Sequence, residues 1–455
     1  MAHPWPAWQE YTQFDAATHD EDFADAKIAI INEYGIEALQ QSWLKVCSEL
    51  SIVTQEIASK GSDIIPIFDS NQILAKGFTH QQKDAAKSIG AFVCKATISS
   101  DDATDLYSDL KTYLDNNKGR IPAWPKESPS MLMLYDSPVQ NELRTHPRHL
   151  RLQEKLNELW HDSTGETSSA PLIYLDGVRD RAPGQEFLGL GPHIDAGSLA
   201  RWVDPSYRHV YHEVFSGRPE QLDIYDLGLR KDARQDLYPG IAHSSVLRTF
   251  QGWTAFTPTC SGQGTILVYP NASWAIAYVM LRPFFCAPAD PDQIMDASKW
   301  TVDRTSAWFP GTVKADSQRL SRSSHPHLRL EECMVAMPPI EPGDTVWWHA
   351  DVSGDRSGNV SAMDLANDIQ VCHAVDTRHD GTQNAAVAYI AACPTTPINK
   401  AYVQKQLAAI LQGRRAPDYV EDGDTLDERT LVGHCGLHDI DAEGRRAFGF
   451  ELEVQ

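Results

Sequence analysis

The sequence lacks long apolar runs and any close pairing of cysteines. No stretch of about 18 consecutive apolar residues occurs, so the sequence predicts no membrane-spanning helix. The 8 cysteines are scattered and form no CxxC pair, which argues against a zinc site or a disulfide framework. Scattered cysteines are typical of reduced thiols in the cytoplasm. The first residues carry neither a basic segment nor an apolar core, so we expect no secretory signal.

Basic residues are scarce relative to acidic ones. The chain has 40 Lys and Arg against 62 Asp and Glu, which gives a formal net charge of −22. A surface this acidic repels phosphate backbones and anionic lipids, so we expect neither nucleic acid nor a membrane as a partner. The apolar fraction of 42% is sufficient for a large core. These features predict a cytoplasmic globular protein and leave a homo-oligomer open.

Helical patterns lie near both ends of the chain. Apolar residues recur at helical spacing over residues 36–53, and Ser99 precedes a further helical pattern at 104–114. Other helices are predicted at 81–88, 147–160 and 397–413. These helices flank a middle region of different character.

The middle region is rich in short β-forming runs separated by Gly, Pro and Asp. The predicted strands are 90–98, 130–135, 172–178, 187–195, 246–259, 264–270, 335–337, 344–349 and 384–392. Many short strands with turn residues between them favour an antiparallel barrel or sandwich. The sequence therefore predicts an α+β fold in which N- and C-terminal helices buttress a β-rich core.

Two long polar segments interrupt the predicted strands, at about 203–245 and 286–330. Long loops in a compact domain often cover a site, so we expect irregular structure there that encloses a small-molecule pocket. The same pattern divides the chain into an N-terminal helical region, a β-rich core, and a C-terminal helix with its tail. The predicted boundaries are 1–125, 126–396 and 397–455.

A histidine and an aspartate stand two residues apart in the Gly/Pro-flanked run GPHIDAG, at 191–197. In an extended segment, the side chains of His193 and Asp195 point to the same face. A second histidine from elsewhere in the chain would complete a facial triad of two histidines and one carboxylate, which holds iron(II) and leaves positions open. The His-x-Asp spacing alone is weak because it occurs by chance in many proteins.

Two histidines are candidates for the third ligand. The run PGDTVWWH, at 342–349, is a turn followed by an aromatic strand that ends at His349. Farther along, His373 precedes the predicted strand at 384–392. This order is similar to the last strands of double-stranded β-helix iron oxygenases, in which the distal histidine opens the final strands.

Several ordered motifs resemble the DUF1479 family of 2-oxoglutarate/iron(II) oxygenase-like proteins. The resemblance lies in 191–202 (GPHIDAGSLARW), 248–258 (RTFQGWTAFTP), 264–270 and 343–352, and covers roughly 90–415. It implies a double-stranded β-helix core, of the jelly-roll or cupin-like type. It also implies a dioxygenase that uses iron(II), 2-oxoglutarate as co-substrate and molecular oxygen. Such an enzyme would hydroxylate, desaturate or cyclise a small molecule, with His193, Asp195 and His373 as catalytic metal ligands.

The sequence departs from the family pattern between the two candidate histidines. The segment 353–371 is polar and rich in Gly, Ser and Asp, which predicts a solvent loop inserted at the rim of the barrel. We carry the distal ligand onto His373, because His-x-Val followed by a strand is the family's feature. His349 remains the second candidate.

The far carboxylate of 2-oxoglutarate needs a cation, and a bidentate arginine is the best partner. Arg248 begins a predicted strand and is the first candidate, with Gln251 as a polar neighbour. Three more arginines lie close in sequence to the His-x-Asp motif: Arg179, Arg181 and Arg201.

Two other functions are consistent with the same residues. A non-catalytic β-barrel binding protein would have a metal site degraded around the 353–371 insertion. A cupin-like enzyme would keep the triad but use another metal and no keto acid. Metal content together with 2-oxoglutarate binding distinguishes these from an oxygenase.

Overall fold

The computed structural model describes most of the chain. The described residues are 5–11, 21–185, 187, 191–195, 199–234, 237–238, 246–314, 317–350, 371–419, 426–438 and 440–452. The predicted solvent loop at 353–371 lies outside these residues, apart from Val371.

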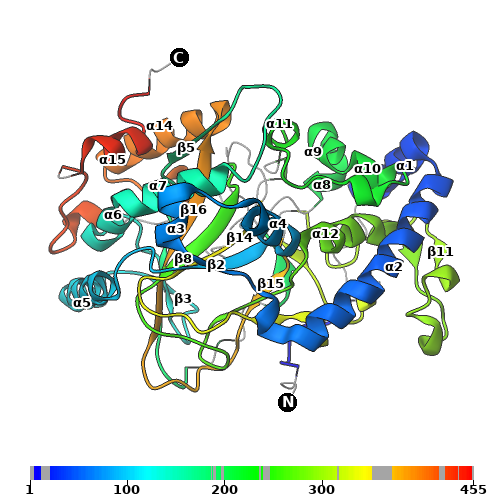
Figure 1. Cartoon of the computed structure of the whole chain (residues 1–455), viewed down its shortest axis with the longest axis horizontal. Coiled ribbons are helices and arrows are strands. Elements are labelled where there is room, and N and C mark those ends of the chain that lie inside the picture. The colour runs from blue at the N-terminus through cyan, green and yellow to red at the C-terminus, as the bar shows by residue number, and fades with distance from the viewer. Residues whose placement is uncertain are drawn as a thin grey trace.

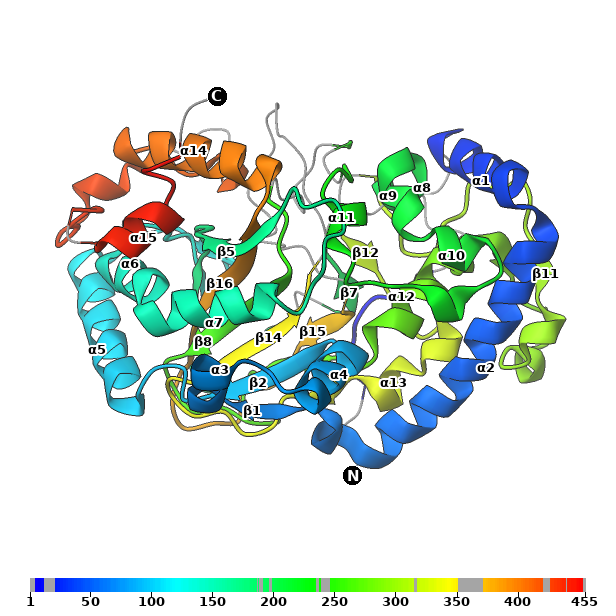
Figure 2. The same ribbon diagram turned by 45° about the horizontal axis from the view of Figure 1, so that its top comes forward.

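A large sheet forms the centre of the molecule (Figures 1 and 2). Its strands, in spatial order, are β1 (Ile67–Asp69), β2 (Ala91–Lys95), β14 (Thr345–His349), β8 (Phe250–Ala255), β16 (Ala385–Thr395), β6 (Val178–Arg181), β4 (Met131–Leu132) and β3 (Ala123–Trp124), and β5 (Ser168–Leu172) pairs with β16. The β1–β2 pair is parallel and the other pairs are antiparallel. The sheet therefore takes strands from both sides of residue 125.

A smaller antiparallel sheet carries the His-x-Asp motif. Its spatial order is β12 (Gln318–Arg319), β7 (His193–Ile194), β15 (His373–Val375), β9 (Ile266–Val268) and β13 (Val335–Ala336). A separate hairpin pairs β10 (Phe285–Cys286) with β11 (Thr301–Val302). Within the described residues, neither the large sheet nor the small sheet closes on itself. The structure therefore has two open sheets, where the sequence predicted a barrel. The mixed α+β class is confirmed.

Helices flank the sheets on both sides. The helices are α1 (Glu21–Tyr34), α2 (Ile36–Lys60), α3 (Ser70–Lys76), α4 (His80–Ile89), α5 (Ser100–Asn116), α6 (Pro138–Thr145), α7 (Pro147–Asn157), α8 (Ala200–Val203), α9 (Pro205–Val210), α10 (His212–Phe215), α11 (Leu227–Arg230), α12 (Ala272–Leu281), α13 (Leu330–Cys333), α14 (Pro397–Leu411) and α15 (Ala442–Ala447). Figure 1 shows α1 and α2 at one end of the molecule and α5, α6, α14 and α15 at the other.

Short 3-10 helices occupy many of the connections. They are η2 (Gly61–Ile64), η3 (Pro219–Gln221), η4 (Arg282–Phe284), η5 (Pro291–Gln293), η6 (Ala297–Lys299), η7 (Pro326–Leu328), η8 (Pro417–Tyr419) and η9 (Glu428–Thr430). Among the described residues, no helix combines the length and apolarity that crossing a membrane requires.

Local signals explain the helices that the sequence predicted. In α2, Leu39, Trp43 and Leu50 are buried, as their helical spacing requires, and the helix continues to Lys60 before Gly61 ends it. The Ser99 hydroxyl accepts the backbone N–H of Asp102 and caps α5. These helices could be predicted from the sequence because one face of each is apolar and a capping residue or a glycine marks an end.

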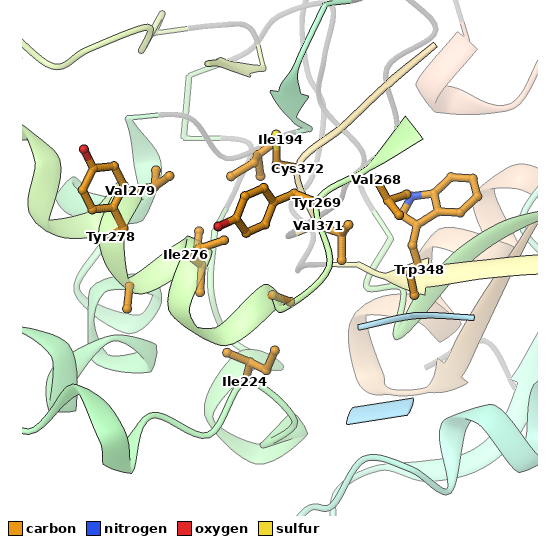
Figure 3. Close-up of a cluster of buried hydrophobic side chains, with 14 of the residues drawn as sticks. Ile194, Ile224, Val268, Tyr269, Ile276, Tyr278, Val279, Trp348, Val371 and Cys372 are labelled. Atoms are coloured by element: carbon orange, nitrogen blue, oxygen red, sulfur yellow. The ribbon is translucent and has the colours of Figure 1, made fainter. Parts of the chain in front are cut away.

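The helix α12 escaped sequence prediction because it has no polar face. Eight of its ten residues are buried, so its sequence shows no amphipathic period. Figure 3 shows Ile276, Tyr278 and Val279 of this helix packed in a cluster that also contains Ile194 of β7, the strand of the His-x-Asp motif. The cluster packs α12 against the small sheet, next to the His-x-Asp motif.

The segment 203–245 is largely helical where it is described, which corrects the expectation of an irregular insertion. It contains α9, α10, η3 and α11, and aspartates cap two of these helices: Asp204 caps α9 and Asp226 caps α11. Helices of four to six residues are too short to show a 3.6-residue period. The second segment, 286–330, contains the 3-10 helices η5, η6 and η7 and the two-residue strands β11 and β12, as expected of a polar connection.

The strand predicted at 172–178 is wrong. The structure instead has β5, which ends at Leu172, and β6, which begins at Val178, with irregular backbone between them. Residues 173–175 are buried apolar side chains that pack against the C-terminal helices rather than extend a sheet. An apolar run alone does not distinguish these two arrangements.

Candidate metal centre

Neighbouring strands of the small sheet bring two histidines together. His193 of β7 lies directly opposite His373 of β15 in the antiparallel register. Asp195 follows β7, two residues beyond His193. One ligand atom from each of the three side chains lies within 4.8 Å of the other two. Strand pairing therefore gathers all three ligands that the sequence predicted.

Backbone carbonyl groups orient both imidazole rings. His193 Nδ1 lies 2.7 Å from the carbonyl oxygen of Gly191, and His373 Nδ1 lies 3.3 Å from that of Val371. Each Nδ1–H can donate to its carbonyl, which leaves Nε2 of each ring as a lone-pair donor. This is the tautomer that a metal ion bound at Nε2 requires.

The Nε2 atoms face the same carboxylate. His193 Nε2 is 3.1 Å from Asp195 Oδ1, and His373 Nε2 is 3.8 Å from Asp195 Oδ2. In that tautomer each ring would direct its Nε2 lone pair at a carboxylate oxygen. A cation shared by the three side chains removes that repulsion, so the donor set fits a divalent metal ion.

Burial sets the charge states of these groups. Burial, followed by the neighbouring His193, lowers the pKa of His373 to about 3, so its imidazole is neutral at pH 7. For Asp195 burial opposes ionisation, but His193 and His373 outweigh burial and lower its pKa. A neutral imidazole and an ionised carboxylate are the forms that bind a metal.

His349, the second candidate for the third ligand, lies in different surroundings. Its Nε2 is 2.9 Å from the carbonyl oxygen of Ile224, and its ring stacks on Trp160 with 4.6 Å between ring centroids. The adjacent Trp348 points to the other face of the strand and approaches His373, with 5.9 Å between ring centroids. The structure therefore brings His373, and not His349, to the His-x-Asp motif.

A cavity beside the three ligands lies between the two sheets. It has about 710 Å³ of empty space, which includes its opening to solvent. Residues from both sheets line it: Met131, Arg179, His193, Asp195, Gln251, Trp253, Thr257, Thr259, Gly264, Thr265, Ile266, Trp348, His373, Val375, Ala385, Ala386, Val387 and Tyr389. About half of these residues are apolar or aromatic and most of the others carry polar side chains, a mixture that suits a small-molecule site.

The predicted co-substrate residues differ in position. Gln251 lines the cavity, whereas Arg248 does not and holds its guanidinium 4.8 Å from the ring centroid of Tyr174. Among the described residues that line the cavity, Arg179 is the cation. Its Nε and Nη2 atoms are buried and make no hydrogen bond to the described part of the chain. Sequence reasoning did not rank Arg179 first, because the strand predicted there ended at residue 178 and left this arginine in a connection.

Arg181 and Arg201, which are also near the motif in sequence, support the backbone around the cavity. Arg181 donates to three backbone carbonyls: those of Gln185, Asp376 and Thr377. Arg201 donates to the backbone carbonyl of Asp195 at 2.8 Å, behind the candidate ligand. Neither side chain lines the cavity.

One protein-family model matches nearly the whole chain. The Gig2-like family model covers residues 17–357 and 365–450. The chain belongs to the Gig2-like family.

Relatives of this Gig2-like chain come from bacteria and a yeast. The uncharacterised protein YbiU of Escherichia coli K12 is 29% identical over 432 residues, which cover 91% of this chain and 93% of YbiU. The Candida albicans product of GlcNAc Inducible Gene 2, a DUF1479 protein, has a similar structure with a TM-score of 0.82 at 25% identity, over 96% of this chain and 90% of that chain. A Salmonella typhimurium LT2 protein, named provisionally as an oxidoreductase, has a TM-score of 0.77 at 26% identity. The match covers 96% of this chain and 100% of that chain. The resemblance to DUF1479 proteins is therefore confirmed.

Proposed function

We propose that this Gig2-like protein is a metal-dependent oxidoreductase, and specifically an iron(II)- and 2-oxoglutarate-dependent oxygenase of a small molecule. The observation that carries the proposal is the buried group of His193, Asp195 and His373, whose ligand atoms lie within 4.8 Å of one another beside a cavity. Two histidines and one carboxylate with open positions form the ligand set of non-haem iron oxygenases. The provisional oxidoreductase name of the Salmonella relative is consistent with it.

The path of the chain supports a double-stranded β-helix as the core. From β6 to β16 the chain passes between the sheets: β6, β8, β14 and β16 join the large sheet, and β7, β9, β13 and β15 join the small one. Each set forms four adjacent antiparallel strands, in the orders β14-β8-β16-β6 and β7-β15-β9-β13. Two facing four-stranded sheets with repeated crossings are the arrangement of a jelly roll.

The three ligands would hold iron(II) at the cavity end of the small sheet. When bound, the ferrous ion supplies the site at which 2-oxoglutarate and molecular oxygen are activated to oxidise a substrate. Gly191 and Val371 keep the two imidazole rings oriented through their carbonyl oxygens. The protein's own contribution is therefore a pair of imidazoles already oriented beside one carboxylate.

Among the described residues of the cavity wall, Arg179 is the cationic group available for the far carboxylate of 2-oxoglutarate. Arg179 is 6% exposed and lines the cavity, so its guanidinium can pair with a carboxylate away from bulk water. Gln251 of β8 lines the same cavity and can donate or accept a hydrogen bond. We assign the anchoring role to Arg179 in place of Arg248, and keep Gln251 as a second polar group of the same cavity.

The remaining walls suit a compact organic substrate. Trp253, Trp348 and Tyr389 give the cavity an aromatic lining that excludes water. The acidic chain, at −22, does not favour a nucleic acid substrate. Hydroxylation, desaturation and cyclisation are the outcomes open to such a site.

The test is anaerobic binding of iron(II) followed by 2-oxoglutarate. We expect one iron(II) per chain, a visible charge-transfer band when 2-oxoglutarate is added, and succinate after exposure to oxygen. In His373→Ala, stoichiometric iron binding should be lost. His349→Gln is the matched control, because the glutamine amide can still donate to the carbonyl of Ile224.

Each outcome separates the hypotheses. A folded wild-type protein that takes up no metal would overturn the metal centre and favour a binding protein. Metal uptake without 2-oxoglutarate binding would favour the cupin-like enzyme. Loss of iron in His349→Gln, with retention in His373→Ala, would reverse the assignment of the third ligand.

A further inference from the structure

The N-terminal segment of residues 5–11, here called the strap, crosses the backbone that precedes the candidate metal ligands. The strap is far from this backbone in sequence, yet Trp8 packs directly on Gly191. A methyl group at Gly191 would lie 3.0 Å from Cγ and 3.3 Å from Cδ1 of the Trp8 indole. Trp8 is buried, and its indole covers one side of Gly191, which is itself half-buried.

The covered peptide is the one that orients His193. The carbonyl oxygen of Gly191 lies 2.7 Å from His193 Nδ1. The next carbonyl, that of Pro192, accepts the backbone N–H of Leu320 at 2.8 Å. Movement of the Gly191 peptide would therefore turn the imidazole of His193.

Polar contacts fix the far end of the strap to the strand that pairs with β7. Glu10 accepts hydrogen bonds from Arg322 Nε at 2.8 Å and from the backbone N–H of Ser323 at 3.0 Å. The backbone N–H of Tyr11 donates to Ser321 Oγ at 3.0 Å. These residues directly follow β12, in which Arg319 pairs with His193.

Near its start, the strap has an aromatic contact with the same region. Trp5 meets Trp8 edge to face, with 5.0 Å between ring centroids, and the guanidinium of Arg322 lies 5.3 Å from the Trp5 ring. The strap thus touches both sides of His193: the peptide before it and the strand beside it.

We propose that the strap is a positioning element of the metal centre, and that Trp8 is the positioning residue that holds the Gly191 carbonyl against His193. The inference rests on the proposed metal centre and adds a part of the chain that the metal motif does not contain. Groups that orient metal ligands affect metal affinity by about 10- to 100-fold when they are removed.

The first test measures iron(II) binding to the full chain by calorimetry under nitrogen. Trp8→Ala should raise the iron(II) dissociation constant about tenfold. Trp8→Phe, which keeps a ring over Gly191, should recover most of the affinity. Trp5→Ala is the comparison variant, because it removes an indole from the same strap but not the one that lies on Gly191, and its effect should be the smaller.

A double-mutant cycle tests the contact itself. Gly191→Ala should weaken iron(II) binding because the added methyl group pushes Trp8 outward. In the Trp8→Ala background the same change should have no further effect, because the space is then open. Additive effects of the two substitutions would overturn the proposed coupling.

A second readout needs no metal. In the metal-free protein, hydrogen exchange at the Leu320 amide should accelerate in Trp8→Ala and stay at the wild-type rate in Trp5→Ala. If the wild-type chain binds no iron, the proposed function fails. The exchange data then still show whether Trp8 holds the Gly191 peptide in place. Wild-type affinity and wild-type exchange in Trp8→Ala would overturn the inference.

Discussion

Two buried arginines near the candidate centre differ in what surrounds them. The Arg248 guanidinium lies over the ring of Tyr174, in the core that joins the sheet to the C-terminal helices. The Arg179 guanidinium lines the cavity and lies 5.1 Å from the ring centroid of Phe187. Among the described residues no carboxylate forms an ion pair with Arg179, so this buried cation keeps most of its attraction for an anionic ligand.

Replacing Arg179 with methionine should therefore weaken 2-oxoglutarate binding while iron(II) still binds. Hydrogen bonds to a charged group contribute roughly 1.5–3 kcal/mol, so we expect about 10- to 100-fold weaker binding of 2-oxoglutarate. The measurement is titration of the iron(II) protein with 2-oxoglutarate. Arg248→Met is the control, and a larger loss in that variant would return the anchoring role to Arg248.

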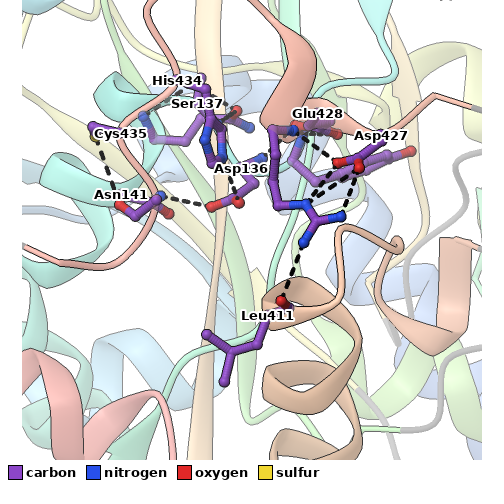
Figure 4. Close-up of polar contacts among 12 residues, drawn as sticks. Asp136, Ser137, Asn141, Leu411, Asp427, Glu428, His434 and Cys435 are labelled. Carbon is purple, nitrogen blue, oxygen red and sulfur yellow. Dashed lines mark hydrogen bonds and ion pairs between the residues drawn. The ribbon is translucent and has the colours of Figure 1, made fainter.

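At the scale of elements, the C-terminal segment 426–438 is held against the turn that precedes α6 (Figure 4). The carboxylate of Glu428 accepts the backbone N–H groups of Tyr135 at 3.1 Å and of Asp136 at 2.8 Å. His434 Nε2 lies 3.0 Å from Asp136 Oδ2. Two titratable side chains thus attach this segment to the rest of the fold.

Both groups bind protons more tightly in the folded chain. Burial raises the pKa of Glu428 from 4.5 to about 7. The hydrogen bond with Asp136 raises the pKa of His434 above 6.5. Because the native state binds more protons than the unfolded state, the free energy of unfolding decreases as pH rises. The stabilisation from Glu428 is lost between pH 4.5 and about pH 7, and that from His434 is lost from pH 6.5 through its folded pKa.

We predict that the attachment of residues 426–438 weakens between pH 5.5 and pH 8.5. Amide exchange in this segment, corrected for the intrinsic pH dependence, should become faster relative to exchange in β16. The double variant Glu428→Gln/His434→Gln should lose most of this dependence. An unchanged pH profile in the double variant would show that other groups control the segment.

At the scale of the whole molecule, the candidate centre depends on the complete fold. Its ligands come from β7 and β15, which are far apart in the chain and meet only in the small sheet. The cavity beside them needs strands of the large sheet as well. A ligand that binds only the native state stabilises it by mass action.

Metal removal should therefore lower the thermal stability of the protein. At a free metal concentration of about 100 times the dissociation constant, binding contributes about 2.7 kcal/mol, or roughly 3–5 °C in Tm for a chain of this size. Calorimetric scans with iron(II) under nitrogen and with chelator measure this difference. His373→Ala should show no difference, and an equal shift in that variant would place the stabilising metal elsewhere.

The amphipathic helices and capped ends could be predicted from sequence because their signals are local. Trp43 follows Leu39 by four positions and Leu50 follows Trp43 by seven, which is one and two helical turns, and Ser99 marks the start of α5. The helix α12 could not be predicted from periodicity, since it is buried on all sides. Likewise, the sequence does not show whether the apolar residues 173–175 join a sheet or pack on helices, because tertiary contacts determine this.

The sequence by itself determined the family, the acidic charge and the pairing of His193 with Asp195, because each depends on residue identity or near neighbours. Only the tertiary structure decided which distant side chains join them. The register of β15 against β7 brings His373 to the motif, and the packing of the strap brings Trp8 to Gly191. Such choices depend on contacts between remote segments, which spacing along the chain does not encode.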